Sequence, residues 1–409
     1  MEEEFSPIAV VDIGTSLTKA IIGRKYSEHE VEILGIGTFP STGLKNGSIV
    51  NIETTTKSIL ESIASAELMA GEEVNSILVN VSGKSIRSVN EKGIISVSHK
   101  DRTINEDDLI RVIDQAQSIA VPVDQEILHV LARQFKVDDE DNVKDPIGMT
   151  GVRLEALVHI VLCGITSLQN IQRTVESAGF LLSDRVLSSL ASSESVLTTS
   201  EKDLGIAVVD IGSGICDVII FQDGGIVHTG VVPFGGFNIT SDLSIGLKTT
   251  VETAEIVKKR FAHCRINMID PLEKIDIPSI GGRPPKIVNR EDLVAITEPR
   301  MREILEMIDM EITRSGVKSS LAGGVLLTGG GSLLAGIEEL AEEVLGLSVS
   351  KVKPAGVTGL KENATGPEYS CAIGLLKYAI KNQIITDRIA KPEKTGWASK
   401  VRRWMEDNL

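Results

Sequence analysis

Two short segments of the chain share one pattern of residues that suits phosphate and magnesium binding. The segment VVDIGTS at residues 10–16 returns as VVDIGSG at residues 208–214. In each segment an aspartate, Asp12 or Asp210, ends an apolar β-rich run, and small residues follow it. Small residues let backbone N–H groups approach an anion closely, and a carboxylate there can hold the water shell of Mg²⁺. Two such turns facing each other would hold the phosphates of one nucleotide.

A third glycine-rich turn, Gly329–Ser332, follows a predicted buried strand and precedes a predicted helix. Its backbone can lie flat against a base or sugar, or meet a phosphate at a helix N-terminus. An ordinary strand-to-helix turn has the same residue types, so this assignment depends on the two aspartate turns. Other phosphate motifs are absent, since the chain has no GxxxxGK[ST] sequence and Gly35-Ile36-Gly37 lacks the third glycine of a dinucleotide loop.

Weaker candidates surround these turns. Lys19 follows the first turn and would either meet a phosphate or lie solvated at a strand end. Gly235-Gly236 joins a strand to a helical stretch and is either a nucleotide contact or a plain loop. Glu255 and Lys258 lie one helical turn apart, so they would face a base or ribose or form an ordinary exposed ion pair.

The predicted ligands of ATP and Mg²⁺ come from all of these segments, and no catalytic residue is predicted. Asp12 and Asp210 are expected to hold the metal through water. The nucleotide ligands are Asp12, Gly14, Thr15, Ser16, Lys19, Asp210, Gly212, Ser213, Gly214, Gly235, Gly236, Glu255, Lys258, Gly329, Gly330, Gly331 and Ser332.

The bulk composition indicates a globular protein of more than one domain. The chain has 409 residues, of which 42% are hydrophobic and 24% charged. The net charge of −15 argues against a nucleic-acid partner. The four cysteines have no CxxC spacing, which favours reduced thiols in a cytosolic protein. The acidic start, MEEE, is no signal peptide, and no apolar run approaches the ~20 residues that span a membrane.

Hydrophobic periodicity predicts an α/β plan that occurs twice. In the first half we expect strands at 8–13, 18–22, 31–38 and 77–81 and a helix at 52–69. In the second half we expect strands at 206–210, 217–221, 226–233 and 324–328 and helices at 250–260, 290–314, 337–345 and 369–381. A different region lies between them, with strands at 93–98, 127–137 and 154–161 around a helix at 106–118 capped by Asn105. Thr166 and Gln169 predict a capping box for the next helix.

The end of the chain has its own composition. Both tryptophans, Trp397 and Trp404, lie within the last 13 residues, after a linker at 388–396 that holds Pro392 and Gly396. On a helix Trp397, Val401, Trp404 and Met405 share one face, and Arg402 and Arg403 lie beside it. This pattern predicts a helix in a membrane interface, the alternative being a terminal helix packed on the body.

Together, these motifs resemble those of the actin, Hsp70 and sugar-kinase ATPases, in which similar turns line a cleft between two duplicated domains. More narrowly, the chain resembles the FtsA family of bacterial cell-division proteins over nearly its whole length. The segments that carry this resemblance are 9–19, 43–47, 79–83, 235–240 and 296–300, together with the basic amphipathic end.

The resemblance implies an α/β, duplicated two-domain ATPase fold of the actin/Hsp70 type, with an inserted FtsA-type subdomain and a C-terminal amphipathic helix. The implied domains are a first core (1–81 and 163–203), the insert (82–162), a second core (204–233 and 301–387), an outer subdomain (234–300), the linker (388–396) and the membrane helix (397–409). The resemblance also implies binding of ATP with Mg²⁺.

The implied partners are those of a division protein on the cytoplasmic face of the cell membrane at the septum. They are further copies of the chain in filaments, the C-terminal peptide of FtsZ, anionic inner-membrane lipid and later division proteins. By resemblance the FtsZ peptide docks on the outer subdomain through Arg300, with Arg290 a weaker candidate. An ordinary ion pair on a helix surface is the alternative for Arg300.

One position departs from the family pattern. FtsA-like chains usually carry Glu-Pro before the Leu-Ala-Ser-Ser stretch, and Ser188-Ser189 stands there instead. The lost carboxylate implies weak ATP hydrolysis at most. Two other functions stay open at the level of sequence: a pilus-assembly ATPase like PilM, for which a membrane-inserting tail is unexpected, and a sugar kinase, which would need a base for a sugar hydroxyl.

Overall fold

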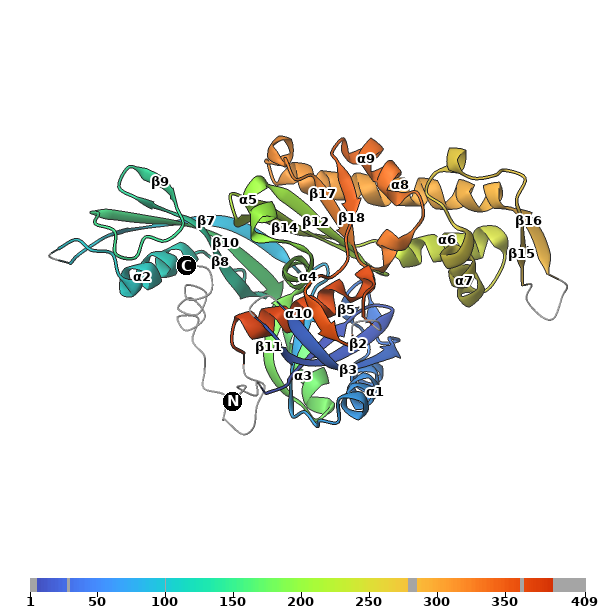
Figure 1. Ribbon diagram of the computed structural model, residues 1–409, viewed down its shortest axis with the longest axis horizontal. Helices are drawn as coiled ribbons and strands as arrows, with labels where there is room; N and C mark the ends of the chain where they lie inside the picture. Colours follow the sequence, from blue (N-terminus) through green and yellow to red (C-terminus); the bar gives the residue numbers. More distant parts are fainter. Residues whose placement is uncertain (1–5, 28–29, 100, 279–284, 361–363, 385–409) are drawn as a thin grey trace.

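The computed structural model describes residues 6–27, 30–99, 101–278, 285–360 and 364–384. The chain forms two large sheets, each with its own helices, and a smaller sheet at one end of the molecule (Figure 1). The second half and its outer helices lie in one row with the smaller sheet, and the first half lies beneath this row in the view of Figure 1. Among the helices of the described segments, none combines the length and the hydrophobicity of a membrane-spanning helix.

The first half is built on a six-stranded sheet of order β11-β6-β1-β2-β3-β19. A meander of antiparallel strands is extended by β6, which runs parallel to β1. The strands are β1 (Ile8–Ile13), β2 (Leu17–Lys25), β3 (Val31–Pro40), β6 (Ser76–Val81), β11 (Leu181–Leu187) and β19 (Val357–Gly359). A small hairpin of β4 (Leu44–Lys45) and β5 (Ser48–Ile49) follows β3.

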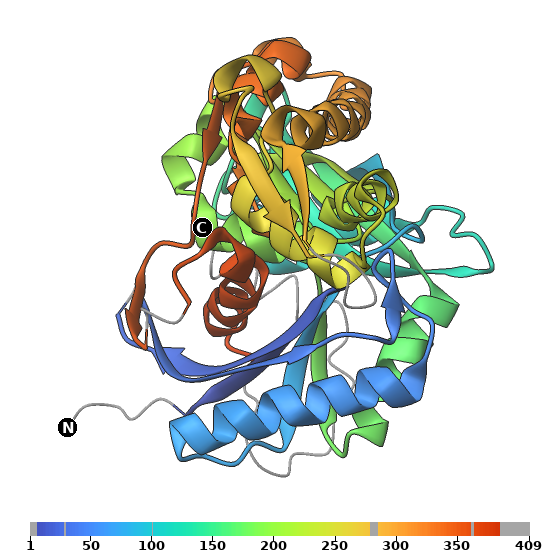
Figure 2. The same ribbon diagram turned by 90° about the vertical axis from the view of Figure 1, so that its right-hand side faces the viewer.

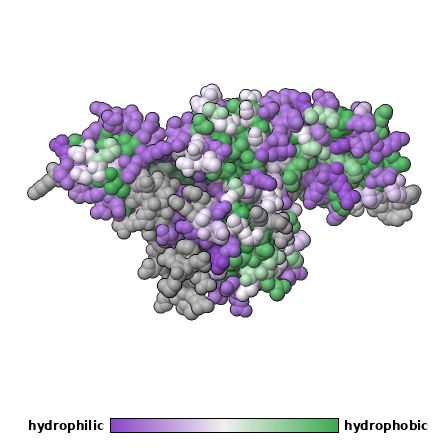
Figure 3. All heavy atoms as spheres, viewed as in Figure 1, coloured by the Kyte–Doolittle hydropathy of each residue, from purple (hydrophilic) through white to green (hydrophobic). Residues whose placement is uncertain are grey.

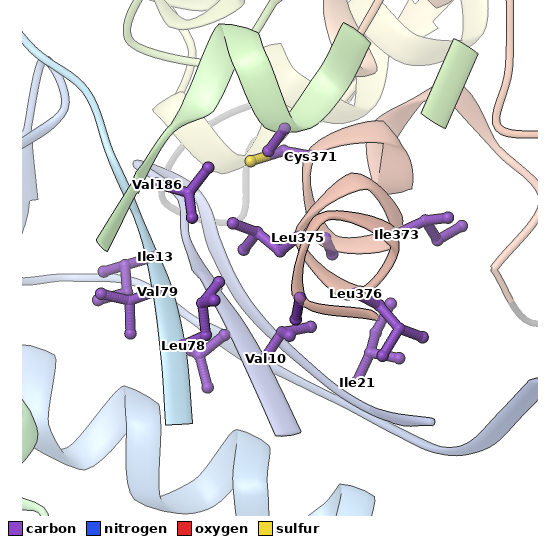
Figure 4. Close-up of a cluster of buried hydrophobic side chains, with 14 of the residues drawn as sticks. Val10, Ile13, Ile21, Leu78, Val79, Val186, Cys371, Ile373, Leu375 and Leu376 are labelled. Atoms are coloured by element: carbon purple, nitrogen blue, oxygen red, sulfur yellow. The ribbon is translucent and has the colours of Figure 1, made fainter. Parts of the chain in front are cut away.

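Helices cover both faces of the first sheet. Helix α1 (Ile52–Ala70) lies on one face and α10 (Ser370–Lys381) on the other (Figure 2). Asn51 caps α1, accepting a hydrogen bond from the Thr54 amide, and Gly71 ends it in the left-handed region at φ +71°. The core under α10 joins Leu375 and Leu376 to side chains of β1, β2 and β6 (Figure 4). Helices α3 (Ile165–Ser177) and α4 (Ser188–Val196) complete this half.

The second half repeats the plan with a five-stranded sheet of order β14-β13-β12-β17-β18. Strand β12 pairs antiparallel with β13 and parallel with β17, as β1 does with β2 and β6. The strands are β12 (Ile206–Ile211), β13 (Cys216–Gln222), β14 (Gly225–Val232), β17 (Val325–Thr328) and β18 (Val349–Lys351). The helices are α5 (Thr199–Leu204), α8 (Arg290–Arg314) and α9 (Ile337–Leu345), with 3-10 turns η3 (Lys318–Ser320) and η4 (Gly330–Leu333). A further 3-10 turn, η6 (Pro367–Tyr369), contacts η4 and leads into α10.

Two smaller units flank the second sheet. One is a four-stranded sheet of order β7-β10-β8-β9 with its own buried core. It holds β7 (Arg87–Ser96), α2 (Glu106–Gln117), β8 (Gln125–Val137), β9 (Glu140–Val143) and β10 (Arg153–Gly164). The other holds α6 (Gly236–Leu247), α7 (Val251–Phe261), η1 (Ile266–Met268), β15 (Lys274–Ile277) and β16 (Lys286–Asn289). We call the first unit the insert and the second the outer subdomain.

Most expected elements are found within a few residues of their predicted ends, and Asn105 caps α2 as predicted. The capping box at Thr166 and Gln169 is wrong, because α3 already begins at Ile165 with Gly164 at its N-cap and no side-chain cap. The assignment of residues 301–387 to the second half is also wrong at its end. Strand β19 pairs with β3, and α10 packs on β1 and β2, so both belong with the first half.

Candidate nucleotide site

In the first aspartate turn the carboxylate forms an ion pair with a lysine of the same hairpin. Asp12 lies at the end of β1, and its Oδ2 is 2.8 Å from the Lys19 Nζ on β2. The other oxygen, Oδ1, accepts a hydrogen bond of 3.0 Å from the Asn80 side-chain amide of β6. Burial, the strongest influence, would lower the pKa of Lys19, but the ion pair with Asp12 leaves that pKa raised. Lys19 is therefore a buried cation, and the alternative of a solvated strand-end lysine is wrong.

The second aspartate turn holds two carboxylates instead. Asp210 of β12 pairs in register with Asp217 of β13. Ser192 of α4 donates a hydrogen bond of 2.5 Å to Asp210, and Ser82 bonds to Asp217. Burial is the main cause that raises the pKa of Asp210 to about 6, and the charge of Asp12 adds to it. Burial, followed by the charges of Asp210 and Asp12, raises the pKa of Asp217 to about 8.

The two turns face each other across the halves, as the sequence predicts. A Cβ atom added at Gly214 would lie 2.8 Å from the Thr15 side chain, so only glycine lets the turns approach this closely. The Thr15 hydroxyl also accepts a hydrogen bond of 3.3 Å from the Gly47 amide. Gly14, Ser16, Gly212 and Ser213 lie in the same two turns, whose backbone is the predicted phosphate contact.

The two weaker glycine segments also lie at this place. The Gly236 amide donates to the Gly212 carbonyl at 3.0 Å, which fixes Gly235-Gly236 against the second turn. Gly329 has a φ of +79°, and a Cβ atom there would lie 2.1 Å from the Asp210 carboxylate. Gly330, Gly331 and Ser332 form η4 beside it. Helix α9 begins only at Ile337, so this turn is not directly at a helix N-terminus.

Glu255 and Lys258 form a partly buried pair rather than an ordinary exposed one. The Lys258 Nζ is 2.7 Å from the Glu255 carboxylate, and the lysine side chain is 11% exposed. Lys258 also donates to the Gly236 carbonyl at 3.0 Å and to the Thr240 hydroxyl at 2.8 Å. Lys258 therefore holds the Gly235-Gly236 turn in place through its hydrogen bond to the Gly236 carbonyl.

Several residues at the site were not predicted. Asn80 bonds to Asp12, Ser192 bonds to Asp210, and Ser82 bonds to Asp217, which pairs in register with Asp210. Asp217 had a signal in the sequence, because it follows Asp210 at the same interval at which Lys19 follows Asp12. Ser188 accepts a hydrogen bond of 3.0 Å from Asn80, so the departure from the family pattern lies beside the first turn.

The charges of the site fit a bound cation. Asp12, Asp210 and Asp217 bring three carboxylates together beside the ammonium of Lys19, a formal sum of −2 when all are ionised (−3 + 1). Within the ranges that the structure describes, no group of three or more His, Cys, Asp or Glu side chains is arranged to hold a metal directly. The prediction of an ion held through water does not require such a group.

The predicted partner residues lie apart from this site, on α8. Arg300 donates to Asp242 of α6 at 2.5 Å and to Glu303 at 2.6 Å. Arg290 donates to the Phe261 carbonyl at 2.9 Å and to Glu273 at 2.8 Å, so it joins the ends of α7 and α8. The predicted membrane residues, from Trp397 to Met405, lie outside the described residues.

The sequence matches two family models. One, described as cell division protein FtsA, matches residues 207–374, and the other, an SHS2 domain inserted in FtsA, matches residues 83–162. Cell division protein FtsA of Pseudomonas aeruginosa is 42% identical over 410 aligned positions, which cover 98% of each chain. FtsA of Escherichia coli K12 is 33% identical and covers 97% of this chain and 96% of its own.

Solved structures show the same fold at low identity. The PilM–PilN type IV pilus biogenesis complex aligns with a TM-score of 0.65 at 14% identity, over 91% of this chain and 98% of that chain. MreB5 of Spiroplasma citri bound to ADP aligns with a TM-score of 0.56 at 13% identity, over 93% and 97% of the two chains. These likenesses show an actin-like fold.

Proposed function

Because the chain belongs to the FtsA family of cell-division proteins, we propose that it binds ATP with Mg²⁺, assembles into actin-like filaments and tethers FtsZ to the cytoplasmic membrane. The observation that carries the nucleotide part is the pair of facing turns with its surplus of carboxylates. The related fold of MreB5, solved with ADP, agrees with it. The sequence likeness to FtsA over nearly the whole chain favours this role over a pilus ATPase or a sugar kinase.

Asp210 and Asp12 would hold waters of the metal, which supplies positive charge against the phosphates. The backbone of Gly14–Ser16 and Gly212–Gly214 would hold the phosphates, and Gly329–Ser332 and Gly235-Gly236 would flank the nucleoside. Asp210→Ala should remove magnesium-dependent ATP affinity in calorimetry and leave the fold intact. Asp203→Ala, at an exposed aspartate of the same half, is the control. Unchanged affinity in the Asp210 variant would refute the assignment.

We expect little ATP turnover, so the nucleotide would act as a ligand that stabilises the closed state of the two halves. Ser188 and Ser189 stand where related chains carry Glu-Pro, and the Ser188 hydroxyl is already engaged with Asn80 and the Val81 carbonyl. A turnover above roughly 1 per second, within the ordinary enzyme range, would contradict this expectation.

Filament formation rests on family membership. We propose that the insert and the outer subdomain provide the contacts between copies, since they lie at opposite ends of the long axis (Figure 1). Sedimentation with ATP, and electron microscopy on lipid monolayers, should show filaments. Protein that stays monomeric under both conditions would refute the proposal.

The outer subdomain is the proposed dock for the FtsZ peptide. Apolar side chains are exposed over it (Figure 3), among them Phe237 and Ile245 of α6. Arg300 lies beside that helix through its bond to Asp242. Arg300→Glu should abolish peptide binding and spare ATP binding. Arg314→Glu, at an exposed arginine of α8 with a similar pair to Glu311, should leave both peptide binding and ATP binding unchanged. Peptide affinity within twofold of wild type would count against Arg300.

We propose that residues 397–409 anchor the protein to anionic lipid through Trp397, Val401, Trp404 and Met405. Burying four large apolar side chains gains on the order of 6–10 kcal/mol, and each basic residue near anionic lipid adds about 1 kcal/mol. Ordering about a dozen residues costs about 1–2 kcal/mol each, so one tail is a marginal anchor, and a filament of linked tails binds much more tightly.

Trp404→Glu, or deletion of residues 397–409, should release the full protein from anionic liposomes and leave ATP binding unchanged. Ser399→Asp, which adds one negative charge on the side of the predicted helix opposite the four apolar residues, is the control. If the truncated protein still floats with the liposomes, the anchor assignment is wrong. A retained anchor would place the protein at the cytoplasmic face of the membrane, where later division proteins can join it.

A further inference from the structure

The insert is joined to one half of the protein and packed against the other. Strand β6 of the first half leads into it, and β10 leads out of it to α3 of the first half. Its sheet nevertheless lies alongside β14 and α5 of the second half (Figure 1). Its position therefore depends on both halves.

A chain of three hydrogen bonds, of which the last is buried, joins the insert to β14. The Asn90 amide of β7 donates to the Val227 carbonyl at 2.8 Å, which leaves its oxygen as an acceptor. That oxygen lies 2.8 Å from His159 Nδ1, and His159 Nε2 lies 3.0 Å from the Thr229 hydroxyl. Burial, the main cause, and neighbouring cations lower the pKa of His159 to about 3, so its ring is neutral. Nδ1–H then donates to Asn90, and Nε2 accepts from Thr229.

Charged side chains continue this contact toward the turn between β13 and β14. Arg133 of β8 packs against Gly225, where an added Cβ atom would lie 2.8 Å from the Arg133 Cα. Asp223 attracts the Arg133 guanidinium. Lys144 of the insert lies 2.9 Å from Asp203 of α5. The insert thus presents cations to carboxylates of the second half.

The hydrogen bonds from the insert to the first half lie close to its points of attachment. The Leu187 amide donates to His129 Nε2 at 3.0 Å, and the Ile165 amide donates to the Asp124 carbonyl at 2.9 Å. His129 pairs in register with Val161, near the end of β10 at Gly164. The other attachment holds Gly83, which has a φ of +120°. Glycine at both attachments suits a change of backbone angle there.

We propose that the insert moves with the second half as one body when the cleft opens or closes, turning about its attachments at Gly83 and Gly164. Its position relative to the first half then follows the state of the cleft. The cause is the cost of breaking the bonds to β14, which would leave the buried side chains of His159 and Thr229 without their hydrogen bond. This inference depends on the proposed function at one point, namely that nucleotide binding moves the two halves relative to each other.

The experiment measures two distances in the full-length protein by spin-label spectroscopy. Glu140→Cys on the insert is combined with Leu68→Cys on the first half or with Met310→Cys on the second half, all at exposed positions. The native cysteines are buried. A non-hydrolysable ATP analogue with Mg²⁺ should shift the distance from the insert to the first half and leave the distance to the second half unchanged. The reverse result would overturn the proposal.

Thr229→Val tests the hydrogen-bond chain without nucleotide and without changing the insert. In this variant the distribution of distances between the labels on the insert and on the second half should become broader than in the wild type. Thr313→Val, at an exposed threonine of the same half, should keep the narrow distribution. An unchanged distribution in Thr229→Val would overturn the proposal. Calorimetry on the same proteins separates the two inferences, because absent nucleotide binding refutes the proposed function while the Thr229 result still decides the inference about the insert.

Discussion

The two aspartate turns are nearly identical in sequence and differ in charge. Asp12 pairs in register with Lys19, and Asp210 pairs in register with Asp217. The first turn therefore balances its charge within its own hairpin. In the second turn the carboxylates bond to hydroxyl groups of the other half, Ser192 and Ser82.

This difference assigns unlike tasks to the duplicated halves. The first turn is complete before any ligand binds, because Lys19 compensates Asp12 through a bond of 2.8 Å. The second turn has carboxyl groups with raised pKa values, which burial and mutual repulsion leave poorly stabilised as anions. A cation between the turns would relieve that repulsion, so we expect the second turn to be the part of the site that responds to Mg²⁺.

The largest effect should come from opening the ion pair of the first turn. Lys19→Met leaves the buried Asp12 without its cation, and breaking a buried pair from one side costs about 3–5 kcal/mol. Arg24→Met removes an ion pair from the same strand, but that pair with Glu32 is partly solvated and should cost under ~1 kcal/mol. Urea unfolding of the nucleotide-free proteins measures both. Equal losses would show that the first turn is not balanced by Lys19.

The second turn should make stability depend on pH in the opposite sense to an ordinary paired aspartate. Asp217 titrates at about 8 when folded and at about 4 when unfolded. Between these values the folded state holds a proton that the unfolded state has lost, so stability falls as pH rises. The slope reaches about 1.4 kcal/mol per pH unit for each such group. Asp210, titrating at about 6, adds to it at lower pH.

Asp217→Asn should flatten this profile above pH 6, where Asp210 has already titrated. The measurement is urea unfolding between pH 5 and 8 with a chelator and without nucleotide, the lower limit lying about one unit above the unfolded pKa of aspartate. A parallel profile in the variant would show that Asp217 is ionised in the free protein.

Much of this site could be predicted from local sequence patterns. The aspartates, the glycine turns and the strands around them could be predicted because each depends on residues close in sequence. Asn80, Ser82 and Ser192 could not, because they reach a carboxylate only through the pairing of β6 with β1 and the approach of the two halves. Ser and Asn in isolation have no pattern that distinguishes a ligand from a surface residue.

Burial in the folded protein decides between the alternatives that the sequence left open for Lys19. A lysine at a strand end is usually solvated, but α10 returns from the far end of the chain to cover β1 and β2, and Lys19 lies 9% exposed beneath it. The return of the chain to the first half also explains why residues after 356 were wrongly assigned to the second half. No local sequence pattern shows which of the two sheets a helix will cover. Asp217 could have been predicted as a site residue from the sequence, because it has the same position in the second hairpin as Lys19 has in the first.

A smaller effect is expected at the glycine that packs on the second turn. Gly329→Ala places a Cβ atom 2.1 Å from Asp210 and 2.7 Å from the Ile211 carbonyl at a φ of +79°. Gly346→Ala has a similar φ of +64° with no atom within 4 Å, so it carries only the backbone penalty of about 1–2 kcal/mol. Gly329→Ala should lose more stability than this control and should also lose ATP affinity in calorimetry. Equal stability with retained affinity would mean that the turn does not support Asp210.

The smallest effect should appear where the two halves share a bond. Ser82→Ala removes the hydroxyl that bonds to Asp217, and a lost hydrogen bond of this kind costs about 0.5–1.5 kcal/mol. That bond lowers the pKa of Asp217, so its loss should move the pH profile of stability toward higher pH. Ser118→Ala, which removes an exposed hydroxyl bonded to the Asp114 carbonyl, should leave the profile in place. Because Ser82 belongs to the first half, a shifted profile would show that the charge of the second turn is set across the cleft. A profile that stays unchanged would mean that each half sets its own.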